Sequence, residues 1–182
     1  MGPIFTLQYA EYLVAEYLAK KLSASVFVPS SAQEKGIDLL LYRYDETKGN
    51  TTTTIQIKMS RTYFGNKKNL PGYDNHLWFN RFQIMDNAGW FILVGIYPIL
   101  AGKGSVKDYR WENIMLAFTN SEMKKFMSEV KQKKNPQMDD KMFGFSFDNS
   151  KSIFQTRGYP TYRDMSSKLI ENRMAEIDSS FN

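Results

Sequence analysis

The sequence predicts one mixed α/β domain. Its length of 182 residues suits a single domain, which we expect to span 1–182. Some segments repeat apolar residues at helical spacing, and others alternate apolar and polar residues one by one, as half-buried strands do. Because the two kinds of segment are interleaved along the chain, we expect a mixed sheet flanked by helices.

Local signals place the elements. Apolar residues at spacings of seven, four and four predict a first helix whose apolar face is made of Leu7, Val14, Leu18 and Leu22. Residues 119–122 read Thr-Asn-Ser-Glu, a capping box that opens a later helix. In chain order we expect a helix over 7–22, strands over 25–28, 37–44 and 52–60, a loop over 61–76, a helix over 77–87, strands over 90–97 and 114–118, a helix from 119, strands over 143–147 and 152–157, and a helix over 165–177.

Two larger units follow from this order. The strand that carries Lys58, the helix over 77–87 and the strand over 90–97 are expected to form a right-handed crossover between neighbouring strands. We expect a core over 6–118, followed by a C-terminal extension of helix, hairpin and helix over 119–182.

The composition excludes several kinds of site. The chain has no cysteine, which excludes disulfides, thiolate zinc sites and cysteine nucleophiles, and its one histidine, His76, excludes a metal site built on two histidines. Lys and Arg outnumber Asp and Glu by 24 to 19, and the net charge of +5 favours a polyanionic partner. No apolar run reaches the about 18 residues of a membrane helix, and the N-terminus lacks a secretory pattern. We therefore expect a cytoplasmic protein with no membrane contact.

Four polar residues are predicted to converge. Glu11 falls within the apolar stripe of the first helix. Asp38 stands at the start of an apolar strand, and Gln56 and Lys58 share one face of the next strand because they are two residues apart. A symmetric hairpin centred on residue 48 sets Asp38 opposite Lys58, with Gln56 on the diagonal. If the first helix packs on that face, Glu11 completes the cluster.

The same residues carry a family resemblance. Gly36-Ile-Asp38, followed by Gln56-Ile-Lys58 on the next strand and preceded by a helix with Glu11, resembles the PD-(D/E)XK nuclease superfamily. The glutamine is similar to the QxK variant of Mrr-like restriction enzymes, and the helix-plus-hairpin opening is similar to archaeal Holliday-junction resolvases. The resemblance covers roughly residues 6–97. It implies a restriction-endonuclease-like mixed sheet flanked by helices.

The resemblance also implies a chemistry, which is metal-dependent hydrolysis of phosphodiester bonds in DNA. A hard divalent cation such as Mg²⁺ or Mn²⁺, held by oxygen ligands, activates water and neutralises the charge that develops on phosphorus. The implied ligands are Asp38, the Gln56 amide oxygen, the Ile57 carbonyl and Glu11, while Lys58 stabilises the attacking water or the transition state. Because Gln56 replaces an acid, we expect weaker metal binding, or one metal instead of two.

Basic and aromatic residues near the long loop are candidates for nucleic-acid contact. Such side chains suit phosphate contact and base stacking, and the candidates are Arg61, Tyr63, Lys67, Lys68 and Arg81. Two other functions stay open at this point. One is a catalytically inactive module of the same fold that binds nucleic acid or a partner chain, and the other is an enzyme that cleaves RNA. A homodimer also stays open, by analogy with nucleases that cut both strands.

Overall fold

A computed structural model of the protein describes residues 9–29, 35–62, 72–80, 82–101, 108–131 and 141–181. Its elements are α1 (Tyr9–Lys21), β1 (Ser25–Phe27), β2 (Leu39–Asp45), β3 (Gly49–Arg61), β4 (Asn75–Asn80), β5 (Trp90–Ala101), β6 (Asp108–Thr119), α2 (Asn120–Glu129), β7 (Met142–Asn149), β8 (Ser152–Arg157), β9 (Arg163–Asp164), a 3₁₀ turn (Ser166–Lys168) and α3 (Ile170–Ser179). None of the described helices is both long and apolar enough to cross a membrane.

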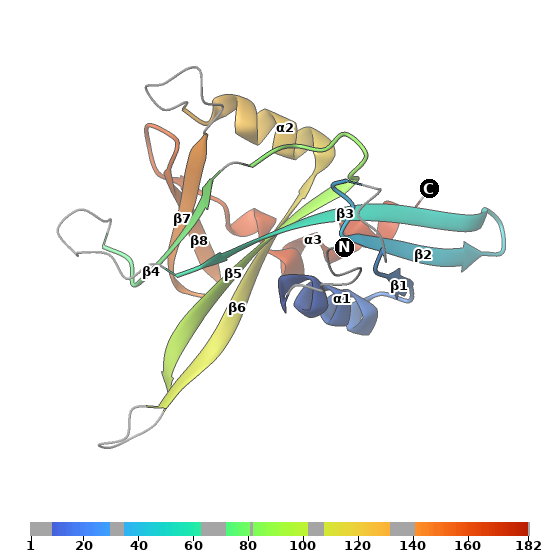
Figure 1. The fold of residues 1–182 in the computed structure, drawn as a ribbon, viewed down its shortest axis with the longest axis horizontal. Coiled ribbons are helices and arrows are strands. Elements are labelled where there is room, and N and C mark those ends of the chain that lie inside the picture. The colour runs from blue at the N-terminus through green and yellow to red at the C-terminus, as the bar shows by residue number, and fades with distance from the viewer. Residues whose placement is uncertain are drawn as a thin grey trace, which may run out of the picture.

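The described strands form two sheets (Figure 1). Sheet A has five strands in the order β1-β2-β3-β5-β6, and sheet B has four in the order β4-β7-β8-β9. Within sheet A, β1, β2 and β3 form an antiparallel meander, β5 runs parallel to β3, and β6 returns antiparallel to β5. The fold is therefore mixed α/β, with a mixed sheet flanked by helices, as predicted.

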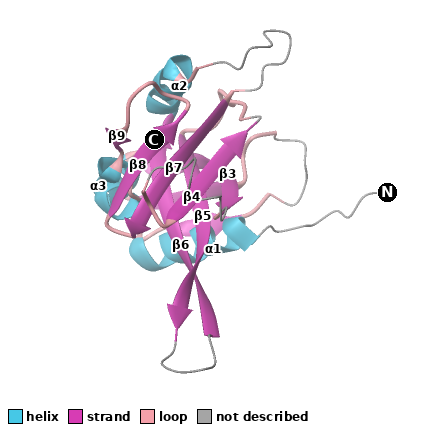
Figure 2. Cartoon of the chain, turned by 90° about the vertical axis from the view of Figure 1, so that its left-hand side faces the viewer, coloured by secondary structure: helices cyan, strands magenta, loops and turns pink. Residues whose placement is uncertain are grey.

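Sheet A is the middle layer of the molecule, and each of its faces is packed differently. On one face, Leu39, Ile55 and Ile92 join the residues of α1 and α3 in one apolar core. On the other face, Phe91 and Leu93 join sheet B and α2 in a second core that is rich in phenylalanine. Successive residues of β5 thus pack alternately in the two cores, so both faces of this strand are buried, as expected of a central strand. Figure 2 shows the β5–β6 ribbon projecting beyond these layers.

Most local predictions are confirmed. The capping box is formed, with the Thr119 side chain accepting from the Glu122 backbone and the Glu122 side chain accepting from the Thr119 backbone. The helix that it opens buries Met123, Phe126 and Met127 as predicted. The predicted strands are all present, and β3, β5 and β6 are longer than expected. The last helix starts later than predicted, at Ile170, after a 3₁₀ turn.

The predicted helix over 77–87 is wrong. In its place, β4 buries Leu77 and Phe79 at a spacing of two, and the chain from Phe82 to Gly89 is irregular. The strand forms because Leu77 pairs with Phe145 of β7, a partner far along the chain that local spacing cannot reveal. The described connection between the parallel strands β3 and β5 therefore passes through a strand of sheet B and contains no crossover helix.

The C-terminal hairpin expected as an extension is part of the core. β7 pairs with β4, and its three phenylalanines, Phe143, Phe145 and Phe147, are fully buried. They lie in the same apolar core as Phe91 and Leu93 of sheet A. The segment over 119–182 is therefore integrated with the segment over 6–118 within the described residues.

Candidate active site

The β2–β3 hairpin fixes the register of the predicted polar residues. Leu39 pairs with Ile55 and Asp45 pairs with Gly49, so the turn is centred on residue 47 and not on residue 48. The Asp45 carboxylate makes this turn by accepting from the backbone N–H groups of Thr47 and Lys48, at 2.8 and 2.9 Å.

The predicted register was therefore wrong by two residues. The pairing ends at Leu39, and the Asp38 backbone N–H donates to the Ile55 carbonyl, so Asp38 is not paired with Lys58 as predicted. A shift of two residues keeps every side chain on its predicted face. Gln56 and Lys58 therefore keep the shared face of β3 that was predicted, and Asp38 lies just before β2, near enough for the charge of Lys58 to act on it.

Asp38 immediately precedes β2, and its side chain reaches the edge of β3. Its backbone N–H donates to the Ile55 carbonyl at 2.8 Å, and its Oδ2 accepts from the Ile57 N–H at 2.5 Å. The Asp38 side chain thus takes the place of a further β2 residue as the acceptor for the Ile57 N–H. The N–H and C=O of one strand residue point to the same side, so the Ile57 carbonyl also faces this edge.

The Asp38 carboxylate is short of positive partners. Burial raises its pKa, and the Ile57 N–H and the charge of Lys58 only partly oppose that effect. The net result is a pKa above the ordinary value. A buried carboxylate in this condition is stabilised when a cation binds beside it.

Gln56, the residue before Ile57, has an unsatisfied side-chain oxygen. The residue is 6% exposed, and its Oε1 is buried with no hydrogen-bond partner in the described part of the chain. Leaving such an acceptor unpaired costs about 1–3 kcal/mol. Carboxylate and amide oxygens are the ligand types that Mg²⁺ and Ca²⁺ accept, and Asp38 and Gln56 carry one of each.

The loop from β4 to β5 positions the segment that leads into Asp38. Gly36 has φ +85°, and a Cβ on it would lie 2.2 Å from the Met85 Cγ, so only glycine fits this left-handed position. The Asn87 side chain donates to the Lys35 carbonyl at 3.1 Å. These contacts were not predicted, although a glycine two residues before Asp38 is the signal that could have indicated them.

Lys58 and Arg61 line a pocket beside this oxygen pair. The pocket has a volume of about 480 Å³ and lies between β3 and β4, with Trp78 and Asn80 among its lining residues. Both cations are exposed. Ser60 joins the two strands, since its Oγ donates to the Trp78 carbonyl at 2.9 Å and accepts from the Trp78 N–H at 3.1 Å. A phosphate group placed here would meet two positive charges.

Glu11 lies on the other side of sheet A. It belongs to the first turn of α1, whose Ala10 and Val14 pack in the core that contains Ile55 and Ile57. Side chains alternate along a strand, so α1 covers the face opposite that of Gln56. The expectation that the first helix packs on the face of the polar residues is wrong, and Glu11 is not on that face.

The remaining candidates for nucleic-acid contact fall outside the described residues. Tyr63, Lys67 and Lys68 belong to 63–71, and Arg81 stands alone between two described segments. Arg61 is therefore the one member of that predicted group whose place is described. In the described part of the chain, no three His, Cys, Asp or Glu side chains are grouped closely enough to hold a metal ion.

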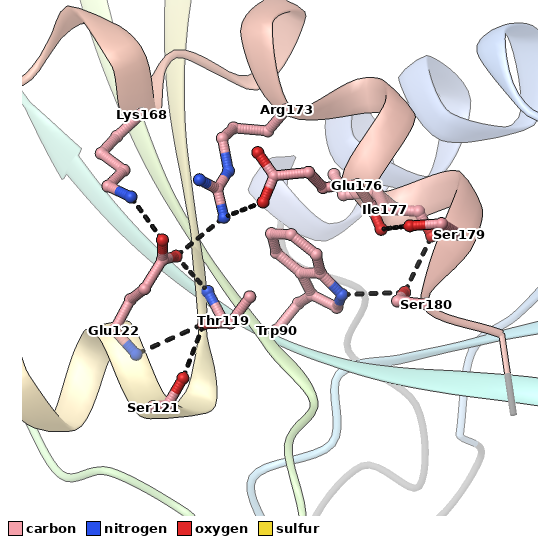
Figure 3. A network of polar contacts seen from close by, with 10 residues as sticks. All are labelled: Trp90, Thr119, Ser121, Glu122, Lys168, Arg173, Glu176, Ile177, Ser179 and Ser180. Carbon is pink, nitrogen blue, oxygen red and sulfur yellow. Dashed lines mark hydrogen bonds and ion pairs between the residues drawn. The ribbon is translucent and has the colours of Figure 1, made fainter.

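A second polar cluster has a different character (Figure 3). The Glu122 carboxylate accepts from Lys168 at 2.5 Å and from Arg173 at 2.8 Å, and Arg173 also pairs with Glu176 at 2.9 Å. The Arg173 guanidinium lies 5.3 Å from the centre of the Trp90 ring. The carboxylates of this cluster are already paired with cations. Its contacts join α3 to α2 and to β5, so its role is to attach α3.

Comparisons of this chain with protein-family models, with curated proteins and with solved structures found no match. The assignment of a function therefore rests on the geometry around Asp38, Gln56 and Lys58. That geometry combines the part-buried Asp38 carboxylate of raised pKa with a buried amide oxygen that has no partner among the described residues and an exposed lysine, the last two on one face of β3.

Proposed function

We propose that the protein is a metal-dependent nuclease that hydrolyses phosphodiester bonds in DNA. The observation that carries the proposal is the Gln56 Oε1, which is buried without a partner in the described part of the chain, while burial raises the pKa of the Asp38 carboxylate bound to the next residue, Ile57. A cation bound between the two groups would give the amide oxygen a partner and would stabilise the charge of the carboxylate. The mixed sheet flanked by helices is compatible with the fold that the Gln56-Ile-Lys58 resemblance implies.

The donor set fits Mg²⁺ or Mn²⁺. The Asp38 carboxylate, the Gln56 Oε1 and the Ile57 carbonyl would hold the ion, and all three are oxygen donors. When bound, the ion supplies Lewis-acid stabilisation and lowers the pKa of a coordinated water. Asp38 contributes a single negative charge and Gln56 contributes none, which favours one ion over two.

Lys58 completes the arrangement on the pocket side. It is exposed on the face of Gln56, and it is near enough to lower the pKa of Asp38 by its charge. From there it would donate a hydrogen bond to the attacking water or to the scissile phosphate. Arg61, which lines the same pocket, would bind a neighbouring phosphate and fix the position of the DNA backbone.

One observation favours a second candidate, a module that binds nucleic acid without cutting it. Gln56 is neutral, and the described residues hold no cluster of three acidic or histidine ligands. In this reading Lys58 and Arg61 bind phosphate groups and no metal enters. The two candidates differ in whether a divalent ion changes what happens to bound DNA.

A cleavage assay separates them. Supercoiled, linear and branched DNA, and RNA, are incubated with the protein in Mg²⁺, in Mn²⁺ or in EDTA. We expect metal-dependent cleavage of DNA that is lost in Asp38→Asn and kept in Asp74→Asn, a control at an exposed aspartate. DNA that is bound and left intact in every metal would establish the binding module, and cleavage of RNA alone would establish an RNA-cleaving enzyme.

A further inference from the structure

Aromatic side chains gather on an uncovered part of sheet A. Phe27 is 52% exposed and Tyr44 is 66% exposed, and Tyr42 is half-buried between them. Tyr42 pairs with Thr52, so alternation places Tyr42 and Tyr44 on the face of Gln56 and Lys58, and Phe27 joins them because it pairs with Leu40. We call Phe27, Tyr42 and Tyr44 the aromatic face.

Apart from the loop over 82–89, whose Asn87 carbonyl accepts from the Thr54 hydroxyl at 2.7 Å, the described chain packs elsewhere. α1 and α3 cover the opposite face, where Leu39 and Leu41 are buried. Sheet B and α2 share their core with β5 and β6 and not with β1 or β2. Figure 1 shows the β2–β3 hairpin extending away from β7 and β8. The aromatic face is therefore open to solvent beside the candidate active site.

The rings are held in place and are surrounded by polar groups. Phe27 and Tyr42 meet edge to face with ring centres 6.2 Å apart, and the Tyr42 hydroxyl donates to the Asn50 side chain at 2.8 Å. Opposite Tyr42 and Leu40, β3 presents Thr52 and Thr54. Fixed rings next to hydroxyl groups suit a flat, partly polar ligand better than they suit a second apolar surface.

The charges around the aromatic face suit a polyanion. Between Asp38 and the hairpin turn, the described residues on this face of β1, β2 and β3 include no acidic side chain. Lys58 stands on the same face at one end, and the turn at the other end exposes both Lys48 and Glu46. The whole chain carries a net charge of +5. Aromatic rings beside a lysine, on a chain of net positive charge, match the bases and phosphates of a nucleic-acid strand.

We infer that the aromatic face stacks the unpaired bases of single-stranded DNA and guides that strand to Asp38 and Lys58. This inference rests on the proposed function and names its substrate, which is DNA with a single-stranded segment. Tyr44 lies six residues from Asp38 along β2, or about 20 Å, so several nucleotides are held before the cleavage site. A continuous duplex cannot use the face, because its bases are already stacked inside the helix.

Binding in EDTA tests the inference without requiring cleavage. Fluorescence anisotropy is measured with a labelled single-stranded oligodeoxynucleotide, with the duplex of the same sequence and with the corresponding RNA. We expect the single-stranded DNA to bind most tightly. Tyr44→Ala and Phe27→Ala should each weaken its binding by about 5- to 150-fold, the cost of losing one stacked base. Tyr44→Phe, which keeps the ring, should bind like the parent.

The matched control is Tyr162→Ala, which removes a tyrosine that is 58% exposed outside sheet A and should leave binding unchanged. Equal affinity for single strand and duplex, or equal losses in Tyr44→Ala and Tyr162→Ala, would overturn the inference. Tighter binding of RNA would overturn the assignment to DNA, and a dimer that Tyr44→Ala dissociates would assign the face to a second copy of the chain. Binding through Tyr44 without cleavage in Mg²⁺ refutes the nuclease and leaves the stacking intact.

Discussion

Two aspartates at opposite ends of β2 show how local structure decides the character of a carboxylate. The Asp45 carboxylate accepts hydrogen bonds from the Thr47 hydroxyl and from the N–H groups of Lys48 and Thr47, which lower its pKa to about 2. Asp38 has one backbone donor, and burial raises its pKa instead. Asp45 therefore shapes the turn, whereas Asp38 retains the capacity to bind a cation.

The raised pKa of Asp38 predicts a gain in stability when its charge is removed. The folded protein disfavours the ionised form of Asp38. The stability that Asp38 contributes is therefore full at pH values below its pKa in the unfolded chain. It is lost as the pH rises through its pKa in the folded protein. Asp38→Asn keeps an acceptor for the Ile57 N–H and removes this cost. In metal-free buffer the variant should unfold at higher urea concentration than the parent near neutral pH.

The control for this prediction is how the stability gained by Asp38→Asn depends on pH. The gain should shrink in acid, where Asp38 of the parent is protonated. Urea denaturation of both proteins at neutral and acidic pH measures it. An Asp38→Asn protein less stable than the parent at neutral pH would show that the ionised carboxylate is well compensated without a metal.

At the scale of elements, the predictions that succeeded rest on neighbouring residues. The Thr119–Glu122 capping box and the alternation along β3 are local patterns, and both describe the structure correctly. The helix predicted over 77–87 failed because β4 is formed by pairing with β7, which comes more than sixty residues later. The hairpin register failed by two residues because the Asp45 side chain selects a turn that symmetry arguments do not specify.

The cluster around Glu122 carries a prediction about how α3 is attached. Burial is the largest single influence on the Glu122 pKa and raises it. The Lys168 hydrogen bond, the Thr119 N–H and the charges of Lys168 and Arg173 together outweigh it and lower the pKa. A lowered pKa contributes stability above the unfolded pKa, and that stability is lost as pH falls through the folded pKa. Glu122→Gln should therefore cost about 1–3 kcal/mol near neutral pH and less in acid.

The control for this prediction is Glu16→Gln, which breaks an exposed pair with Lys20 at 2.6 Å. Such surface pairs contribute at most about 1 kcal/mol. Denaturant midpoints of the two variants and the parent, taken at neutral and acidic pH, measure the difference. Similar losses in both variants would mean that the Glu122 cluster does not anchor α3.

At the scale of the whole molecule, the two faces of sheet A have separate roles. One face packs against α1 and α3 and builds a core. The other is covered by sheet B and α2 over β5 and β6, which leaves Asp38, Lys58 and the aromatic face beside that covering. The sequence predicted correctly that Gln56 and Lys58 share a face of β3. It did not predict which face α1 covers, because an alternating strand pattern does not specify which element packs on each side, and Glu11 was misplaced for that reason.

The net charge of +5 predicts binding to nucleic acid that weakens as salt rises. For single strands the logarithm of the binding constant falls by about 0.7 per phosphate contact for each tenfold rise in salt. Lys58→Gln should make this dependence on salt less steep by about 0.7, the value of one phosphate contact. Lys151→Gln, a control at an exposed lysine in the β7–β8 turn, should leave it unchanged. Anisotropy titrations over a series of salt concentrations measure the slopes, and identical slopes in all three proteins would place Lys58 away from the phosphates.

The central claim is that Asp38 and Gln56 form a cation site, and calorimetric titration with Mg²⁺ and Mn²⁺ tests it most directly. The parent, Asp38→Asn and Gln56→Glu are titrated side by side in metal-free buffer. We expect one weak site in the parent and none in Asp38→Asn. Gln56→Glu should bind at least about tenfold more tightly, because a unit charge about 4 Å from a divalent ion contributes ~8 kcal/mol at an effective dielectric constant of ~20, before the cost of burying it. Three indistinguishable titrations would contradict the account and leave a module that binds without a metal.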